Sequence, residues 1–295
     1  MERLQQAIEK ARTMRQAAQT AGMMAQAGTQ AGMQAAQAGT GGPSWLHHPA
    51  GARMGLPRPD QARPDQAAAP WRALGEMVPD LAALERQRVV TLLAGPEAAH
   101  WDLLRGRIVD QARRHGWRRI VLVSPHGGAG RSTALANLAL SFARAPDLRM
   151  IGLDLDLRRP ALARLLGQEA VSPMAASMED VLARRIPFAA VARRLGERMA
   201  VGFAHAPAAD LGALLAARST RAALDEIDAT YAPDIVLADA PPLAAGAPAD
   251  AALALADAAI LLLEAGRDTV KQADKAERHV AHLTNVLGTV ITKAD

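Results

Sequence analysis

Residues 119–133 read RIVLVSPHGGAGRST and carry the strongest structural signal in the chain. A run of apolar, largely β-branched residues ends at Ser124, three glycines follow, and an apolar period of 3.6 residues starts at Ser132. The pattern predicts a buried strand over 119–124, a glycine-rich turn, and a helix over 132–144. Successive backbone N–H groups of such a turn, at the positive end of a helix, form a cradle for phosphate groups.

The same alternation of strand and helix continues to the end of the chain. Further strands are expected at 149–156, 199–204, from residue 234, at 258–266 and at 285–291. Further helices are expected at 161–166, 178–184, 211–231 in two pieces, and 268–283. Apolar strands that alternate with helices indicate an α/β fold, with a mostly parallel sheet and helices on both faces. Sheets of this kind bind ligands at the carboxyl ends of their strands.

The composition changes near residue 75. Residues 1–75 are rich in Ala, Gln, Gly, Met and Pro, and we expect a short amphipathic helix over 2–18 and then a disordered, low-complexity N-terminal tail. The alternative is a tether or an arm that docks on a partner. Residues 76–295 are expected to form the α/β domain. The first residues carry acids and lack an apolar core, so we expect no secretory leader, and no apolar stretch reaches the length of a membrane span.

The composition also excludes several kinds of chemistry. Cysteine is absent, which removes disulfides, thiol catalysis and cysteine-ligated zinc and fits a reducing compartment. The net charge of +4 is weak evidence for nucleic-acid binding, so no specific nucleic acid is expected as a partner. The basic cluster RRHGWRRI at 113–120 is interpreted as a solvated helix end, with a nucleic-acid patch as the alternative.

Three aspartates are expected at the same edge of the sheet as the glycine-rich turn. Asp154 and Asp156 stand in DLDLRRP at the end of one strand, and Asp239 closes the strand in IVLADAPP. Carboxylates in these positions can hold Mg²⁺ through water or accept a proton from an attacking hydroxyl. The alternative for each is a carboxylate that caps a helix. Their repeated placement at strand ends favours the first interpretation.

The turn matches only part of the phosphate-loop (P-loop) pattern, GxxxxGK followed by Ser or Thr. Pro125 replaces the first glycine, and Arg131 replaces the lysine. The residues expected to bind nucleotide phosphates are Gly127, Gly128, Ala129, Gly130, Arg131, Ser132 and Thr133. Ser132 is also expected to hold Mg²⁺ together with Asp154 and Asp239.

Through these motifs, the run from about residue 101 to residue 295 resembles the bacterial tyrosine kinase (BY-kinase) family. These are cytoplasmic P-loop ATPases of capsule and exopolysaccharide synthesis. The stretches that carry the resemblance are HGGAGRSTALANLALSFAR, IGLDLDLRRPALARLLG, YAPDIVLADAPP, ADAAILLLEAGRDT, LGTVITKAD and the opening MERLQQAIEKAR. The resemblance implies ATP and Mg²⁺ as cofactors, Asp154 as a base-like acid, Asp156 and Arg131 as further catalytic residues, and Asp239 as a metal-supporting acid.

The resemblance also implies partners and a location. A membrane-anchored polysaccharide co-polymerase would act as the adaptor, and it would bring a cytoplasmic protein to the inner face of the membrane. The other implied partners are a protein tyrosine that accepts the phosphoryl group and further copies of the chain in a homo-oligomer. The ring-forming Glu/Arg pattern of the family survives mainly as Arg105, and Asp102 stands where an arginine is often found.

The chain departs from the family at the catalytic lysine. Arg131 keeps the charge but is longer, planar and forked, and with only four lysines in the chain none is expected nearby to replace it. Loss of one transition-state charge contact lowers a rate by about a hundredfold. The first alternative is therefore a nucleotide-binding scaffold without catalysis. The second is a positioning ATPase of the partition type, although His126, interpreted as a solvated loop residue, stands where that branch carries a signature lysine.

Two further residues bear on the substrate. Tyr231 is the only tyrosine, so an acceptor tyrosine has to come from another protein, and Tyr231 itself is expected at the edge of the core. The final TKAD, residues 292–295, is similar to the base-reading motif of GTPases, which keeps GTP as an alternative to ATP.

Overall fold

The computed structural model describes residues 68–145, 147–168 and 176–294 of the chain. The predicted helix over 2–18 and the rest of the predicted tail up to residue 67 lie outside the described residues. In the part of the chain that is described, no helix combines the length and the apolar character needed to cross a membrane.

Eight strands of the described chain form one sheet, in the order β1-β4-β5-β3-β6-β2-β7-β8. The strands are β1 (Gly75–Glu76), β2 (Arg119–Val123), β3 (Met150–Asp154), β4 (Ala192–Leu195), β5 (Met199–Gly202), β6 (Ile235–Asp239), β7 (Ala258–Glu264) and β8 (Asn285–Thr292). Neighbouring strands pair parallel except for the antiparallel pair β4–β5. The predicted mostly parallel α/β sheet is confirmed.

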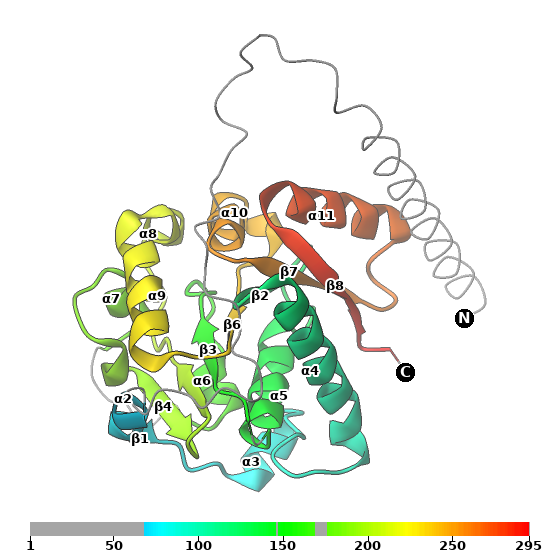
Figure 1. The fold of residues 1–295 in the computed structure, drawn as a ribbon. Coiled ribbons are helices and arrows are strands. Elements are labelled where there is room, and N and C mark those ends of the chain that lie inside the picture. Colours follow the sequence, from blue (N-terminus) through cyan, green and yellow to red (C-terminus); the bar gives the residue numbers. More distant parts are fainter. Residues whose placement is uncertain (1–67, 146, 169–175, 295) are drawn as a thin grey trace, which may run out of the picture. The chain divides into compact units, whose positions relative to one another are not determined.

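Helices cover the two faces of the sheet (Figure 1). Beneath one face lie α3 (Leu81–Arg86), α4 (Pro96–His115), α5 (Arg131–Ala143) and α6 (Leu162–Leu165). Against the other face pack α2 (Ala68–Ala73), α7 (Met178–Leu182), α8 (Leu211–Ala216), α9 (Arg218–Tyr231), α10 (Ala247–Ala254) and α11 (Val270–Leu283). Short 3₁₀ turns, η3 (Phe188–Ala190) and η4 (Leu243–Ala245), lie between elements.

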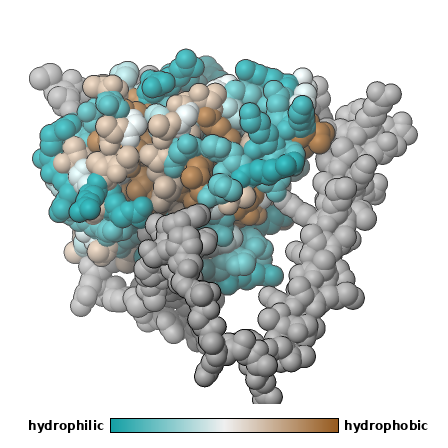
Figure 2. Space-filling view, turned by 90° about the horizontal axis from the view of Figure 1, so that it is seen from above, coloured by the Kyte–Doolittle hydropathy of each residue, from teal (hydrophilic) through white to brown (hydrophobic). Residues whose placement is uncertain are grey.

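The central strands are apolar on both sides because both faces are covered. In β2, Ile120 and Leu122 pack with the core under α5, whereas Val121 and Val123 pack with the core under α9 and α10. Successive side chains of a strand point to opposite faces, so each central strand contributes to both cores. The edge strand β8 is only partly buried, and apolar and polar residues lie side by side on the face seen in Figure 2.

Several elements of the described chain were not among those predicted, and two of them have a clear physical reason. The helix α10 was not predicted, because its alanine-rich sequence APADAALA gives almost no amphipathic contrast. The strand β4 is the second. It carries Arg193 and Arg194 and was not among the predicted strands. Its antiparallel pairing with β5 lets these polar residues lie near the margin of the sheet, where Arg194 pairs with Glu76 at 2.5 Å.

The packed chain begins ahead of residue 76. In α2, the Trp71 side chain is 1% exposed and its indole Nε1 donates to the carbonyl of Tyr231 at 2.7 Å. Tyr231 also makes edge-on ring contacts with Trp71 and Phe188, at centroid separations of 6.1 and 5.4 Å. Tyr231 is therefore the buried residue at the edge of the core that the sequence predicts, with 6% exposure.

Candidate phosphate-binding site

The glycine-rich turn leaves β2 after Val123 and enters α5 at Arg131. Gly128 has φ +89° and Gly130, the N-cap of α5, has φ +86°, a left-handed conformation that residues with a Cβ adopt only under strain. A Cβ added at Gly128 would point into open space, with no atom of the described chain within 4 Å. No described side chain caps α5, so the N–H groups of its first turn are left for an anion.

The strand order brings two of the predicted acids together beside this turn. β6 lies between β3 and β2, and Asp154 of β3 is the register partner of Asp239 of β6. Asp239 is in turn the register partner of Leu122, near the end of β2. Both carboxyl groups are fully buried. The expectation that Asp154 and Asp239 meet at one edge of the sheet, next to the turn, holds in the structure.

Arg131 turns its guanidinium inward to these acids. Its Nη2 donates to Asp156 at 2.8 Å, and its Nε donates to Asp239 at 3.3 Å. Its Nη1 donates to the hydroxyl of Ser124 at 2.5 Å and to the carbonyl of His126 at 3.3 Å. The side chain is 6% exposed. Arg131 is thus a buried cation that bridges two acids, rather than a side chain that extends toward solvent.

Ser132 and Asp154 are also engaged. The Ser132 hydroxyl donates to Oδ2 of Asp239. Oδ2 of Asp154 accepts from the backbone N–H groups of Ala161 and Leu162, at 3.2 and 3.3 Å, so Asp154 caps the start of α6. Oδ1 of Asp154 is buried and has no hydrogen-bond partner in the described chain. Asp154 therefore combines the helix-capping interpretation with a position in the site.

Burial sets the proton affinity of all three acids. Burial raises the pKa of Asp239 to about 6, against the attraction of the Arg131 guanidinium. Burial likewise raises the pKa of Asp156 above its ordinary value, opposed by Arg131. The pKa of Asp154 is raised well above its ordinary value by burial and by the neighbouring Asp239 carboxylate. Because no cation of the described chain contacts Asp154, its neutral form is favoured.

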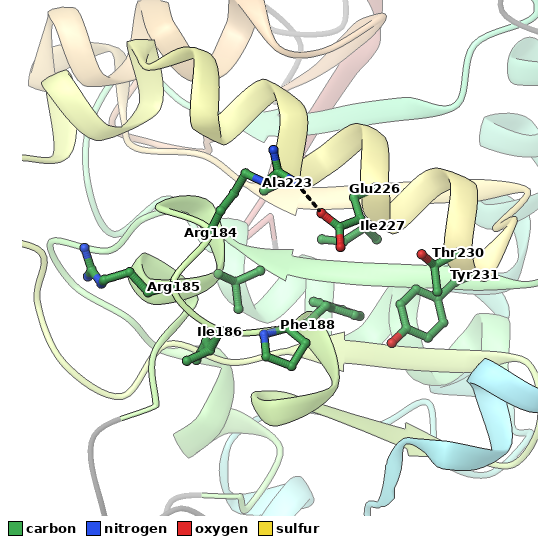
Figure 3. A pocket seen from close by; sticks show the side chains of 11 residues that line it. Arg184, Arg185, Ile186, Phe188, Ala223, Glu226, Ile227, Thr230 and Tyr231 are labelled. Atoms are coloured by element: carbon green, nitrogen blue, oxygen red, sulfur yellow. Dashed lines mark hydrogen bonds and ion pairs between the residues drawn. The ribbon is translucent and has the colours of Figure 1, made fainter.

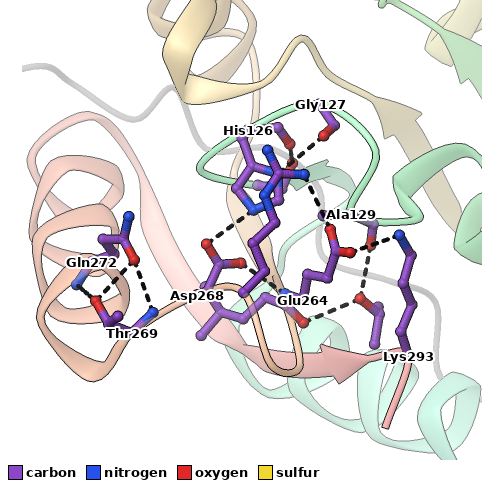
Figure 4. Close-up of polar contacts among 12 residues, drawn as sticks. His126, Gly127, Ala129, Glu264, Asp268, Thr269, Gln272 and Lys293 are labelled. Atoms are coloured by element: carbon purple, nitrogen blue, oxygen red, sulfur yellow. Dashed lines mark hydrogen bonds and ion pairs between the residues drawn. The ribbon is translucent and has the colours of Figure 1, made fainter.

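The far side of the turn is tied to β7, α11 and β8 (Figure 4). Nε2 of His126 and Oδ1 of Asp268 lie 3.0 Å apart, and the His126 side chain is only 18% exposed. The interpretation of His126 as a solvated loop residue is therefore wrong. The bend between β7 and α11 brings Asp268 to it, a long-range approach that no local pattern predicts.

The end of β8 brings Lys293 near the turn, so the expectation that no lysine lies nearby is wrong. The Thr292 hydroxyl donates to the carbonyl of Ala129 at 2.9 Å, and the Nζ of the next residue, Lys293, lies 2.8 Å from Oε1 of Glu264. β8 runs parallel to β7, so its carboxyl end reaches the same edge of the sheet as the turn. Thr292 and Lys293 belong to TKAD, whose Asp295 lies outside the described residues.

Two more residues of the site carry no clear sequence signal. Ser124, which accepts from Arg131, looks in the sequence like an ordinary strand end. Arg159 is exposed, and its Nη1 lies 3.7 Å from the position that a Cβ would take on Gly127. The basic pair after DLDL was the available hint for Arg159. Arg159 places an exposed cation beside the loop.

The donor set does not fit a magnesium ion as it stands. Mg²⁺ requires oxygen ligands in a nearly octahedral arrangement at about 2.1 Å. Both oxygens of Asp239 are taken, one by Arg131 and one by Ser132, and Asp156 is paired with Arg131 as well. Within the described residues, no three acidic or histidine side chains come together as a metal site.

A separate pocket of about 350 Å³ lies between α7, η3 and α9 (Figure 3). It is lined by Tyr231, Phe188, Ile227 and the ion pair of Arg184 with Glu226, whose N–O distance is 3.2 Å. Burial raises the pKa of Tyr231 above its ordinary value, with a further contribution from Glu226. The Tyr231 hydroxyl therefore stays protonated at neutral pH, as a packing residue rather than a nucleophile.

Comparison with known proteins supports the fold assignment. The VpsO kinase domain is 19% identical to this chain, with a TM-score of 0.59 over 72% of this chain and 98% of the other. The BceF tyrosine kinase domain is 18% identical, with a TM-score of 0.57 over 78% and 97%. The kinase domain of the Escherichia coli tyrosine kinase ETK is 18% identical, with a TM-score of 0.61 over 80% and 97%.

Neither a family model nor a curated protein sequence matches this chain. The similarity to the kinase domains above is one of fold. The chain has the α/β P-loop fold of the bacterial tyrosine kinase domains, as its motifs predict.

Proposed function

We propose that this chain binds a nucleoside triphosphate, with ATP as the expected ligand, and acts as a P-loop, kinase-like regulator of exopolysaccharide synthesis. The observation that carries the proposal is the open, uncapped turn between β2 and α5, which adjoins the buried acids Asp154 and Asp239. An anion-binding turn beside two strand-end acids is the arrangement from which P-loop proteins build nucleotide sites.

In this proposal the loop backbone does most of the binding. The N–H groups from Gly127 to Thr133 would receive the phosphate oxygens, because the left-handed Gly128 and Gly130 leave room for them. The exposed Arg159 would add a cation from the side of Gly127. At the opposite side, Thr292 contacts the loop at the carbonyl of Ala129, and the next residue, Lys293, pairs with Glu264 at the end of β7.

The contacts of Arg131 and the burial of Asp154 argue against rapid phosphoryl transfer. The family lysine contacts the phosphates as a point charge, whereas Arg131 is committed to Asp156, Asp239 and neighbouring oxygens. Asp154, the expected base, favours its neutral form. These contacts favour the second candidate function, a nucleotide-binding scaffold with little or no turnover.

The proposed kinase-like role implies several partners. We propose a membrane-anchored polysaccharide co-polymerase as the adaptor, which would place a cytoplasmic protein at the inner face of the membrane and read its nucleotide state. Any phosphoryl acceptor would be a tyrosine of another protein, because Tyr231 is buried. A homo-oligomer remains part of the proposal, and no specific nucleic acid is expected. Nucleotide-dependent, salt-sensitive DNA binding would instead favour a partition-type ATPase.

The test is a titration of the purified chain with ATP and with GTP, by calorimetry, together with ATP turnover of the wild type and Arg131→Lys. We expect saturable ATP binding by both proteins. Turnover that appears only in Arg131→Lys supports the scaffold, and turnover in both proteins supports the kinase-like enzyme. Tighter binding of GTP than of ATP would assign a guanine-reading role to the end of β8.

A matched pair of glycine variants separates loop binding from loss of stability. Gly128→Ala and Gly116→Ala both place a Cβ on a left-handed residue with open space around it. Both variants carry similar backbone strain, about 1–2 kcal/mol. We expect only Gly128→Ala to weaken ATP binding, by at least about tenfold, since its Cβ enters the phosphate cradle. Equal ATP affinities for the two variants would argue against a phosphate site at the loop.

A further inference from the structure

Arg131 occupies an unusual place for a first-turn helix residue. A guanidinium has five N–H donors, and hydrogen bonds to Asp156, Asp239, Ser124 and the carbonyl of His126 use four of them. The acceptors come from three separate segments: the end of β2, the segment after β3 and the end of β6. The cation is therefore fixed from several directions.

The acids that Arg131 holds are those that would otherwise recruit a divalent ion. Asp239 is fully buried and Asp156 is 6% exposed, so both need a positive charge close by. Arg131 contacts one oxygen of each, and the Ser132 hydroxyl contacts the other oxygen of Asp239. Half of the positive charge that Mg²⁺ would bring is therefore already present, and both acids are engaged by it.

A divalent ion added to this arrangement would meet a like charge. An ion bound to Asp239 would sit beside the guanidinium that contacts the same carboxylate at 3.3 Å. Entry of Mg²⁺ would require Arg131 to leave two buried acids, and Mg²⁺ also loses part of its own hydration reluctantly. A lysine would leave more room, because its single ammonium cannot reach along two carboxylates as a forked guanidinium does.

We propose that Arg131 is the resident cation of this site and stands in for the metal ion, so that the loop binds a nucleoside triphosphate without Mg²⁺. This inference rests on the proposed nucleotide binding. It assigns Arg131 a positioning role: its guanidinium pairs with Asp156 and Asp239 and fixes them, while the loop N–H groups and Arg159 contact the phosphates.

The first test uses the wild-type chain and needs no variant. ATP is titrated in EDTA and in excess Mg²⁺, at one ionic strength set with a potassium salt. We expect the two dissociation constants to agree within about threefold, less than 1 kcal/mol. Binding that is tenfold or more tighter in Mg²⁺ overturns the inference but leaves the proposed function intact. No ATP binding in either buffer overturns the proposed function, and the inference with it.

The second test uses the metal alone. Mn²⁺, which takes the same oxygen ligands as Mg²⁺, is titrated by electron paramagnetic resonance without nucleotide. We expect no saturable site in the wild type and a new Mn²⁺ site in Arg131→Gln, at least tenfold tighter than any binding in the wild type. Arg164→Gln, which removes an exposed arginine on α6, is the matched control and should behave as the wild type.

Two outcomes of the metal titration decide against Arg131. Saturable Mn²⁺ binding by the wild type overturns the inference, because the site would then hold a metal despite the guanidinium. A well-folded Arg131→Gln that binds no Mn²⁺ also overturns it, since the freed acids would not be metal-recruiting. Circular dichroism establishes which variants are folded. If Arg131→Gln is unfolded, the ATP and Mn²⁺ titrations of the wild-type chain decide the question.

Discussion

Helix α5 carries a cluster of charged side chains at each end, and the two clusters differ in burial. At its first residue, Arg131 is 6% exposed and holds Asp156 and Asp239. Just past its last residue, Arg144 is 23% exposed and lies 2.6 Å from Asp102, which is 29% exposed. Both clusters connect segments distant in sequence, but only the first is closed to water.

The helix dipole adds a second difference between the two ends of α5. A cation at the C-terminal end of a helix is stabilised by the dipole, whereas a cation at the N-terminal end is not. Arg144 therefore has help from α5 itself, and Arg131 depends on its two acids. A buried arginine placed at the unfavourable end of a helix is poorly explained by stability, which fits a role in the phosphate site.

The largest expected effect is that of Arg131→Gln on the free energy of unfolding. Removing one partner of a buried ion pair costs about 3–5 kcal/mol, because the other charge stays buried and uncompensated. The loss should be largest at pH 8 and smaller at pH 5, since Asp239 and Asp156 can then take up protons, their pKa values being already raised by burial. Urea denaturation at both pH values measures this loss of stability.

Arg144→Gln is the control, and its expected loss is about 1 kcal/mol or less. Equal losses for the two variants would remove the contrast between the two ends of α5.

Asp154→Asn should change stability in the opposite direction. The pKa of Asp154 is raised in the folded chain, so the folded state binds this proton more tightly than the unfolded state. The penalty for a buried carboxylate is absent below about pH 4, near the unfolded pKa, and grows as the pH rises. Asparagine keeps an oxygen for the N–H groups of Ala161 and Leu162 and stays neutral. We expect a gain in the free energy of unfolding at pH 8 that vanishes at pH 4. A loss at pH 8 would mean that the ionised carboxylate has a partner.

Arg159 tests the exposed side of the same end of α5. Arg159→Gln should leave the urea midpoint unchanged, because the side chain is exposed, and should weaken ATP binding by about tenfold. Arg158→Gln, the exposed neighbour, should weaken ATP binding by less than about threefold, and calorimetry compares the two. A larger effect at Arg158 would show that the arginine beside Gly127 is not the phosphate contact.

Local sequence patterns predicted the fold and the position of the site. The strand–turn–helix around 119–133 and the placement of Asp154 and Asp239 at strand ends follow from local patterns, because period, glycines and strand termini are local properties. The parallel sheet follows from the alternation of those elements. All of these appear in the structure.

The contacts within the site were not predictable in the same way. The sequence indicated that Arg131 differs from the usual lysine, but its inward orientation depends on acceptors from three segments. The pairing of His126 with Asp268, and the arrival of Lys293 beside the turn, depend on the order β2-β7-β8 in the sheet. Strand order is a property of the whole fold, and no short motif carries it.

The smallest expected effect lies at the half-exposed end of α5. Arg105 lies 3.0 Å from Asp102 and donates to the Ser141 hydroxyl at 2.8 Å, which joins α4 to α5. Arg105→Gln should cost about 0.5–1 kcal/mol, and a double-mutant cycle with Asp102→Asn should give a coupling below about 1 kcal/mol, because water screens a pair exposed by a fifth or more. A coupling of 3 kcal/mol would equal that expected for a buried pair, and burial would then not be what distinguishes the two ends of α5.

Because Arg105 is engaged within its own chain, the same variant should also leave the sedimentation coefficient unchanged. A shift to a smaller species would identify Arg105 as a contact between copies of the chain.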